Sequence, residues 1–424
     1  MSAVPVILGI LVLLVLRVPV AFAILGPCLV YMSLTDQSTG LSLRTAAQEV
    51  NSFPLLAVPL FILLGVVADR TGIADRIFAF AQVLLGRVRA SLGYVNIGVS
   101  LGFSWISGAA MADVAGTGKM MVPAMTGRGY PRRFTLGLTA SSSLISPVMP
   151  PSIPAIVYAS VAAVSTAALF AAAVVPALLI ALGLALYVFL WSRRRPELAG
   201  RRAEPGEFRR AGLRVIGPLG APVILLGGIL SGLFTPTEAA AVGVAYVVLL
   251  GLAYRRLTLR SLWDITVETA STTASIALIL AASGLLGWVL ARERVPQDVA
   301  SFLLGFTDSP VVFLIMVNVA LIIIGALLEP MAALVITVPV LLPIAAQFGV
   351  DPVHFGVIVI VNLMIGLLTP PIGGVLFVLG SATRTPMHEV FRGTAPFLVP
   401  IVAVLLLLTL APDLVLFLPG LLGL

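Results

Sequence analysis

The chain has few charged side chains for its size. Only 10% of its 424 residues are Asp, Glu, Lys or Arg, whereas 60% are hydrophobic. A soluble domain carries about a quarter charged residues. The mean hydropathy is +1.14, and the apolar segments are continuous runs rather than alternations with a period of two, which argues against a β-barrel. The sequence therefore predicts an all-α polytopic membrane protein.

Residues that carry most enzyme and metal chemistry are scarce. Cys28, the only cysteine, lies in an apolar run, so no intrachain disulfide can form and we expect a small core residue. The two histidines lie at loop edges, and there is no His-Glu-x-x-His motif. Segment 116–120 resembles a phosphate loop but lacks the first glycine and the closing Ser or Thr. We expect no enzyme and no cofactor, and any transport has to draw on an ion gradient.

The net charge of +7 does not indicate a nucleic-acid partner. The arginines cluster in short loops between apolar runs, most densely in 193–214, as expected for the cytoplasmic side of a lipid bilayer. The polar segment 35–51, with Asp36, Arg44 and Glu49, is expected to be a loop. Two further segments, 72–90 and 292–306, are amphipathic and too charged to span. We interpret them as arms that link a fixed scaffold to a moving core; ordinary interfacial helices are the alternative.

Two apolar segments are too long for one crossing and are broken in the middle. Segments 91–127 and 310–347 each exceed the roughly 20 residues that one crossing needs. They predict two re-entrant hairpins, the first turning at Ser107-Gly108. Each is followed by an apolar run with a Pro-Pro pair, 134–160 and 354–382, which predicts two broken helices. Freed carbonyls cost several kcal/mol in hydrocarbon unless protein, water or an ion binds them, so the two breaks indicate binding sites.

The two halves of the chain match at a nearly constant offset. Pro19 pairs with Pro236 at an offset of 217, and Pro150-Pro151 pairs with Pro370-Pro371 at 220. The basic loops place the two copies in opposite orientations, which predicts an inverted-topology repeat. The predicted organisation is a first repeat (1–160), an extra helix with a basic cytoplasmic loop (161–217), a second repeat (218–383) and a C-terminal helix (384–424).

Polar groups at the breaks and hairpin tips are the candidate ligands. Unwound carbonyls and serine hydroxyls suit a small cation such as Na⁺. The predicted first cation site comprises Ser104, Ser107, Gly108, Ser143 and Pro147, and the second comprises Gly325, Met364, Gly366 and Thr369. Half-helix N-termini beyond the proline pairs would hold a carboxylate; the predicted substrate residues are Asp113, Ser152, Asn362 and Gly373. The alternative is that the serine cluster only bonds neighbouring helices.

Few ionisable residues lie inside apolar runs, where they are functional candidates. Asp113 and Glu329 fall near the two hairpin tips. Glu238 follows Thr235 at the spacing of a helix cap, so its carboxylate either stabilises a helix start or belongs to a site. Lys119 either pairs with Asp113 or reaches the cytoplasmic surface.

Five strings resemble segments of the large membrane subunit of tripartite ATP-independent periplasmic (TRAP) transporters. They are Ser52–Phe61 (SFPLLAVPLF), Ser107–Val114 (SGAAMADV), Pro147–Pro154 (PVMPPSIP), Thr235–Ala240 (TPTEAA) and Gly366–Gly373 (GLLTPPIG). The resemblance covers essentially the whole chain. Ala109 departs from it, because many relatives have a second serine there.

The resemblance implies an elevator-type carrier in a bacterial inner membrane. It implies Na⁺-coupled uptake of an organic acid, such as a C4-dicarboxylate, sialic acid or a similar carboxylate. It also implies a small four-helix membrane subunit, expected here as a separate polypeptide, and a periplasmic solute-binding protein. The competing interpretations are a stand-alone ion-coupled anion carrier, an intramembrane enzyme or assembly scaffold, and a channel.

Overall fold

The computed structural model describes residues 3–16, 18–51, 53–198, 200 and 206–424, and every regular element in them is helical. The first half of the chain forms α1 (Val4–Val15), α2 (Val20–Leu34), α3 (Thr39–Val50), η1 (Phe53–Leu56), α4 (Ala57–Arg70), α5 (Ile73–Leu85), α6 (Ser91–Ser107), α7 (Ala110–Thr126), α8 (Arg132–Ser142), α9 (Ile145–Val148), α10 (Ile153–Ala162) and α11 (Thr166–Ser192). The second half forms α12 (Glu207–Leu230), α13 (Pro236–Ala253), α14 (Leu259–Arg292), α15 (Val295–Leu304), α16 (Pro310–Leu327), α17 (Pro330–Gln347), α18 (Pro352–Gly366), α19 (Gly374–Thr383), α20 (Met387–Leu410) and α21 (Pro412–Leu422).

Local sequence sets many of the helix starts. Thr235 and Glu238 form a capping box at the start of α13, which confirms the capping interpretation of this carboxylate. Asp351 caps α18 by accepting bonds from the amides of Val353 and His354. Proline occupies the first turn of α13, α16, α17 and α18, where its missing N–H is not needed.

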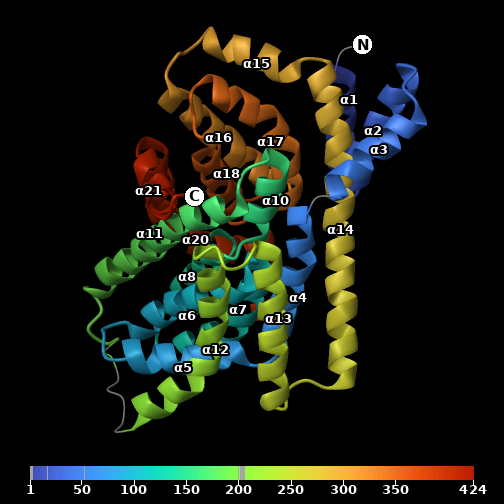
Figure 1. Ribbon diagram of the computed structural model, residues 1–424. Coiled ribbons are helices and arrows are strands. Elements are labelled where there is room, and N and C mark those ends of the chain that lie inside the picture. Colours follow the sequence, from blue (N-terminus) through green and yellow to red (C-terminus); the bar gives the residue numbers. More distant parts are fainter. Residues whose placement is uncertain (1–2, 17, 52, 199, 201–205) are drawn as a thin grey trace.

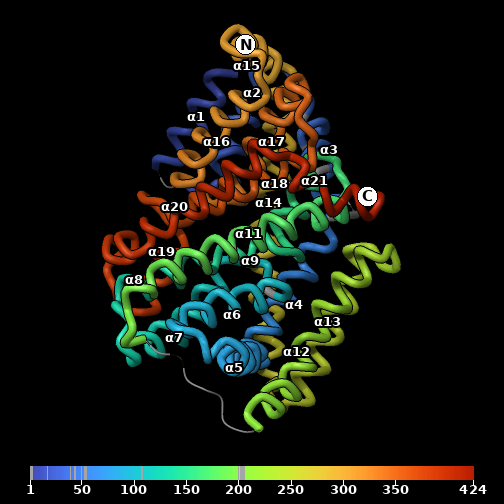
Figure 2. Tube along the Cα trace, turned by 90° about the vertical axis from the view of Figure 1, so that its left-hand side faces the viewer, coloured from blue at the N-terminus to red at the C-terminus, as the bar shows by residue number. Residues whose placement is uncertain are grey.

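The short helices α5 and α15 and the two hairpins lie at opposite ends of the molecule in the two halves of the chain. In Figures 1 and 2, α5 is at the lower end and α15 at the upper end. The helix α4 leads down into α5, with a bend of 67° between them, whereas the long helix α14 leads up into α15. The hairpin α6–α7 lies in the lower part and the hairpin α16–α17 in the upper part. The arrangement is the one that an inverted repeat requires.

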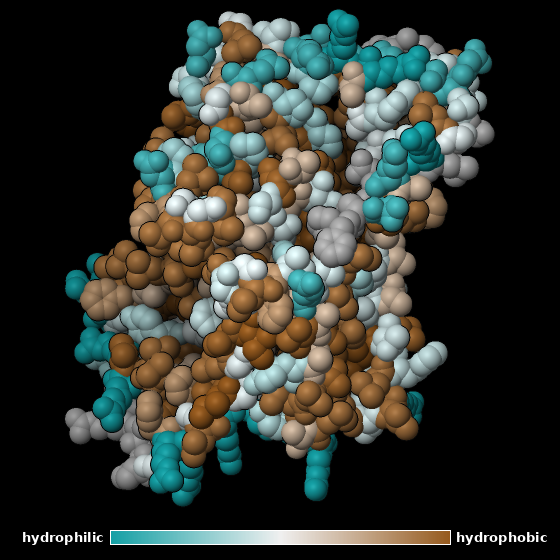
Figure 3. Space-filling view, in the orientation of Figure 1, coloured by the Kyte–Doolittle hydropathy of each residue, from teal (hydrophilic) through white to brown (hydrophobic). Residues whose placement is uncertain are grey.

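The outer surface has the polarity of a membrane protein. Figure 3 shows hydrophobic side chains over most of the middle of the molecule, with hydrophilic ones gathered at its two ends. Among the described helices, seven are long and apolar enough to cross a membrane, or up to nine if each bent pair is one span. The single cysteine, Cys28, is fully buried in an apolar cluster with Tyr31 and Met32, as expected.

Close backbone contacts hold the core helices together. A Cβ atom on Gly137 of α8 would lie 2.0 Å from the carbonyl oxygen of Gly393 in α20. One on Gly393 would lie 2.3 Å from the carbonyl oxygen of Arg133. These distances leave no room for a side chain, so the two helices cross at backbone contact.

Two sequence expectations need correction. The polar segment 35–51 was expected to be a loop, but residues Thr39–Val50 form α3, which Ser38 caps by accepting a bond from the amide of Leu41. The basic loop 193–214 is shorter than expected, because α12 begins at Glu207. Residues 199 and 201–205 of this loop lie outside the described part of the chain.

The Gly137–Gly393 contact predicts that an alanine at Gly137 lowers the stability of the protein, whereas an alanine at an uncrowded glycine does not. Gly137→Ala should lower thermal stability in detergent, because overpacking costs about 1–3 kcal/mol. Gly227→Ala is the matched control, since Gly227 lies inside α12 and, apart from the backbone of α12 itself, no atom of the described residues comes within 4 Å of its Cβ position. It should be neutral or stabilising, because alanine favours a helix over glycine by up to about 1 kcal/mol. Equal melting temperatures for the two variants would contradict the packing described here.

Candidate functional site

The tip of the first hairpin touches the first helix break. The helix α6 ends at Ser107, Gly108 has φ +61°, and α7 begins at Ala110. A Cβ atom on Gly108 would lie 2.7 Å from the carbonyl oxygen of Pro151. Both the positive φ and this contact require glycine. The predicted turn at Ser107-Gly108 is thus confirmed.

In the first break, the carbonyl of Pro147 accepts a hydrogen bond from another residue of the protein. The chain unwinds after the short helix α9, passes through a cis Pro150-Pro151 peptide and begins α10 at Ile153. Ser152 caps α10 by accepting a bond from the amide of Ala155 at 3.2 Å. Its hydroxyl also donates to the carbonyl of Pro147. Ser152 therefore connects the two sides of the break.

The second hairpin and the second break meet in a similar way. Gly325 of α16 packs against Gly366 at the end of α18, where an added Cβ on Gly366 would lie 2.5 Å from the carbonyl oxygen of Gly325. The amide of Ile372 donates to the carbonyl of Ala326 at 3.3 Å. Thr369 directs its hydroxyl to the carbonyl of Ile365 at 3.0 Å. This break also contains a cis peptide, Pro370-Pro371.

Two asparagines, one in each half of the chain, make equivalent side-chain hydrogen bonds between a hairpin and a broken helix. These asparagine bridges were not predicted from the sequence. In the first half the Ser142 hydroxyl donates to the Asn96 side chain at 3.1 Å. In the second half the Asn362 amide donates to the Asn318 side chain at 2.7 Å. Ser142 and Asn362 are 220 residues apart, and the two hairpin asparagines are 222 apart. Each bridge joins the entering helix of a hairpin to the first half of a broken helix.

Several buried oxygen atoms near the breaks have no protein partner. Within the described residues, neither Ser141 Oγ, Ser146 Oγ nor Asn362 Oδ1 makes a hydrogen bond. Both carboxylate oxygens of Asp113 are likewise buried and unpaired. Buried oxygens are seldom left without a partner, and oxygens of these types are suitable ligands for a small cation.

The two hairpin tips, both breaks and α14 enclose a cleft. Its inner cavity, of about 150 Å³, is lined by Gly108, Ala109, Ala110, Met111, Pro147, Ile153, Pro154, Thr272, Ile276, Glu329, Pro330, Met331, Met364 and Leu367. A neighbouring cavity of about 520 Å³ shares Thr272, Ile276, Glu329 and Met331, and extends between α2 and α14. The first turn of α10, through Ile153 and Pro154, opens onto the inner cavity.

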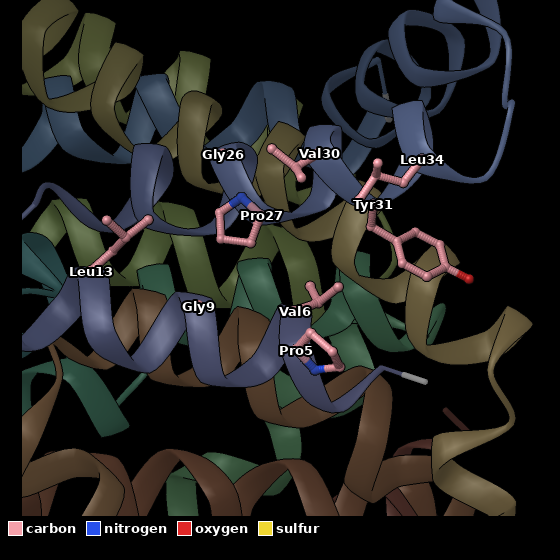
Figure 4. Close-up of a pocket in the computed structure, with 9 residues that line it drawn as sticks. All are labelled: Pro5, Val6, Gly9, Leu13, Gly26, Pro27, Val30, Tyr31 and Leu34. Atoms are coloured by element: carbon pink, nitrogen blue, oxygen red, sulfur yellow. The ribbon is translucent and has the colours of Figure 1, made fainter. Parts of the chain in front are cut away.

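A further apolar groove of about 450 Å³ runs between α1 and α2. Figure 4 shows Gly9 on α1 facing Pro27 on α2 across this groove, and the Tyr31 ring pointing past its end. The Tyr31 hydroxyl donates to Glu293, just after α14. The groove shares no residue with the cleft and is not part of the candidate site.

The structure brings only some of the predicted site residues to the cleft. Gly108, Pro147 and Met364 line it. Ser104 and Ser143 are fully buried, and their hydroxyls donate to the carbonyls of Leu101 and Ala140 in their own helices. The side chain of Ser107 lies outside the described part of the structure.

The predicted substrate residues lie around the cleft rather than in its wall. Asp113 and Asn362 are fully buried behind it. Gly373 is the buried residue before α19, with φ +48°. Sequence analysis missed Thr272 and Ile276. They belong to α14, which is far from the first break and the first hairpin in the sequence.

Lys119 does not pair with Asp113, whose carboxylate has no partner among the described residues. The Lys119 side chain is exposed, which agrees with the alternative in which it reaches the surface.

Comparison with known proteins matches the whole chain to one family. Residues 7–414 match the family model of the DctM component of tripartite ATP-independent periplasmic transporters. The chain is 42% identical to the sialic acid TRAP transporter large permease protein SiaM of Vibrio cholerae, over 98% of each chain. It is 33% identical to the C4-dicarboxylate TRAP transporter large permease protein DctM of Pseudomonas aeruginosa, over 88% of this chain and 87% of the relative.

The fold also resembles that of a solved transporter structure. The YdaH transporter of Alcanivorax borkumensis, described as having an unusual topology, superposes with a TM-score of 0.67. The match covers 96% of this chain and 98% of the other at 15% identity, so it bears on the fold alone. The sequence matches and the paired hairpins and breaks lead to one conclusion: the chain belongs to the DctM family, the large permease component of TRAP transporters.

Proposed function

We propose that this chain carries an organic acid across the bacterial inner membrane together with Na⁺. The observation that carries the proposal is the cleft in which both hairpin tips and both helix breaks meet one face of α14. Paired broken helices in an inverted repeat are typical of secondary transporters with a midplane site. The relatives are named for sialic acid and C4-dicarboxylates, which are both carboxylates.

The breaks supply the groups that would hold the cation. In the first half, Ser141 and Ser146 offer buried oxygens without a protein donor. In the second half, Asn362 Oδ1 is the corresponding atom, near the closely packed Gly325 and Gly366. Since these oxygens are neutral, a bound Na⁺ adds a positive charge beside the cleft. Asp113, whose carboxylate oxygens are also buried and unpaired in the described part of the chain, would offer a counter-charge.

The substrate carboxylate would bind where cation and helix dipole act together. The N-terminus of α10 opens onto the inner cavity, and such termini carry a partial positive charge that attracts anions. Na⁺ bound at the breaks therefore favours loading of the acid, which makes binding of ion and acid interdependent.

The hairpins and breaks would move as one body past α14. The hairpins are tied to the broken helices by the asparagine bridges and the glycine contact. The helix α14 borders the tips across the two cavities and packs directly on α17 further along the second hairpin. The cavities leave room for the tips to move along α14 in an elevator movement, with α5 and α15 as the arms.

The proposed partners are a small membrane subunit and a periplasmic solute-binding protein. The chain covers 67% of the sialic acid TRAP transporter permease protein SiaT of Haemophilus influenzae. That relative therefore includes a further segment, which fits a small subunit fused to the large one. The binding protein would deliver the acid to the cleft.

Uptake in proteoliposomes tests the proposal. Liposomes would contain the chain with its small subunit, and would receive binding protein loaded with sialic acid or a C4-dicarboxylate. We expect uptake only with an inward Na⁺ gradient and with binding protein present, and a K⁺ gradient is the control. Uptake by the chain alone would favour a stand-alone carrier.

Replacing one of the unpaired hydroxyl groups should lower the apparent affinity for Na⁺. We expect Ser146→Ala to raise the Na⁺ concentration for half-maximal uptake by about tenfold or more, since losing a bond to a charged group costs roughly 1.5–3 kcal/mol and each 1.4 kcal/mol is a factor of ten. Ser283→Ala is the matched control, because Ser283 is also buried but belongs to α14, away from both breaks, and is not among the residues that line the two cavities. Ser143→Ala and Thr369→Ala extend the test to both predicted cation sites. An unchanged Na⁺ response in all three site variants would exclude these residues as ligands.

Filling the cleft from the α14 side should stop transport. Thr272→Trp would place a large ring in the inner cavity, and we expect uptake at background level. Thr266→Trp is the control, since Thr266 is an exposed threonine of the same helix that does not line either cavity. Normal uptake by the Thr272 variant would show that the substrate does not pass this face of α14.

A further inference from the structure

A basic groove lies at the C-terminal end of α11, far from the cleft in the fold. Three consecutive arginines follow the helix. The groove encloses about 850 Å³ and is lined by Tyr187, Leu190, Trp191, Arg193, Arg194, Arg195 and Glu197. It shares no residue with either cavity of the cleft. Neither transport nor the hairpins account for it.

Aromatic rings hold two of the guanidinium groups in place. The Arg193 guanidinium lies 4.6 Å from the Phe189 ring centre, and that of Arg195 lies 4.4 Å from the Trp191 ring centre. Trp191 is itself stacked on Phe134 of α8, with ring centres 3.6 Å apart. Arginines fixed on aromatic faces lose little conformational freedom when they bind an anion. An ordinary solvated basic loop would not need this support.

The groove has more positive charge than its own carboxylate can balance. Its three arginines face one acidic residue, Glu197, which lies 3.9 Å from Arg195. Arg194 forms no ion pair with any carboxylate in the described part of the chain. The lining therefore has a formal charge of +2, which favours an anionic ligand.

An exposed apolar stripe on α11 leads directly to the arginines. Leu182, Leu186, Phe189 and Leu190 are 64, 54, 44 and 54% exposed and lie on one side of a helix that is apolar enough to span a membrane. The spacing of three to four residues places them on one face. A ligand that uses the whole surface has an anionic head at the arginines and apolar chains along this stripe.

We propose that the groove binds the headgroup of an anionic phospholipid, with its acyl chains along the stripe on α11. Arg193 and Arg194 bind the phosphate, and Arg195 remains partly balanced by Glu197. Tyr187 and Trp191 lie near the end of this apolar helix, where aromatic residues of spanning helices meet the headgroups. Basic pockets at the ends of spanning helices bind such lipids in other membrane proteins.

Native mass spectrometry of the full chain in detergent tests the proposal. The probes are phosphatidylglycerol, phosphatidylcholine with the same acyl chains, and inorganic phosphate. Arg193→Gln/Arg194→Gln/Arg195→Gln removes the groove charge. Arg209→Gln/Arg210→Gln/Arg214→Gln removes the same charge from α12, outside the groove, as a matched control. The melting temperature of each variant establishes that it is folded.

We expect the wild-type chain to bind phosphatidylglycerol more tightly than phosphatidylcholine. Each basic residue near an anionic headgroup contributes roughly fivefold in affinity, so losing two free arginines should weaken binding about 25-fold. The α12 variant should stay within about twofold of wild type. Equal binding of the two lipids, or equal losses in both variants, would overturn the proposal. Displacement of the lipid by inorganic phosphate would instead assign the groove to free phosphate.

Discussion

Carbonyl groups released where the two broken helices unwind must find partners inside an apolar protein, and the architecture around the cleft follows from this requirement. Part of the need is met internally, because Ser152 bonds the carbonyl of Pro147 across the first break, and Ile372 bonds the carbonyl of Ala326 beside the second. Side-chain oxygens beside the breaks, such as Ser146 Oγ, have no hydrogen-bond partner among the described residues. In a carrier, such unpaired atoms are suited to bind a ligand reversibly.

The same requirement explains why the hairpins pack so closely on the breaks. At Gly108 and Gly366 a side chain would collide with the backbone of the opposing element. Asparagines on the hairpins then bond the adjacent half-helices in both halves. The result is a core whose parts are bonded to one another, which borders α14 partly across the two cavities and partly through direct packing of α17. Bonding within the core is what a rigid-body movement requires.

The architecture could be predicted largely from the sequence, because proline pairs, basic loops and long apolar runs are local signals. The hairpin turn at Gly108 and the cap at Glu238 were predicted correctly. The prediction for segment 35–51 was wrong, because the sequence of a short, polar helix with a serine cap resembles that of a loop. The role of Thr272 was not predictable, since it depends on where α14 packs. Likewise, the hydrogen bonds of the serines cannot be predicted from the sequence. The Ser143 hydroxyl donates to a carbonyl of its own helix, whereas the Ser146 hydroxyl has no partner among the described residues.

The central claim is that Na⁺ completes the two helix breaks, and hydrogen exchange measures this directly. Amide exchange would be followed by mass spectrometry in the purified chain with Na⁺ or with K⁺ at equal ionic strength. Exchange reports local opening, so Na⁺ should slow it in segments 141–152 and 362–374 and leave α11 unchanged. Identical exchange of both segments in the two salts would contradict the account.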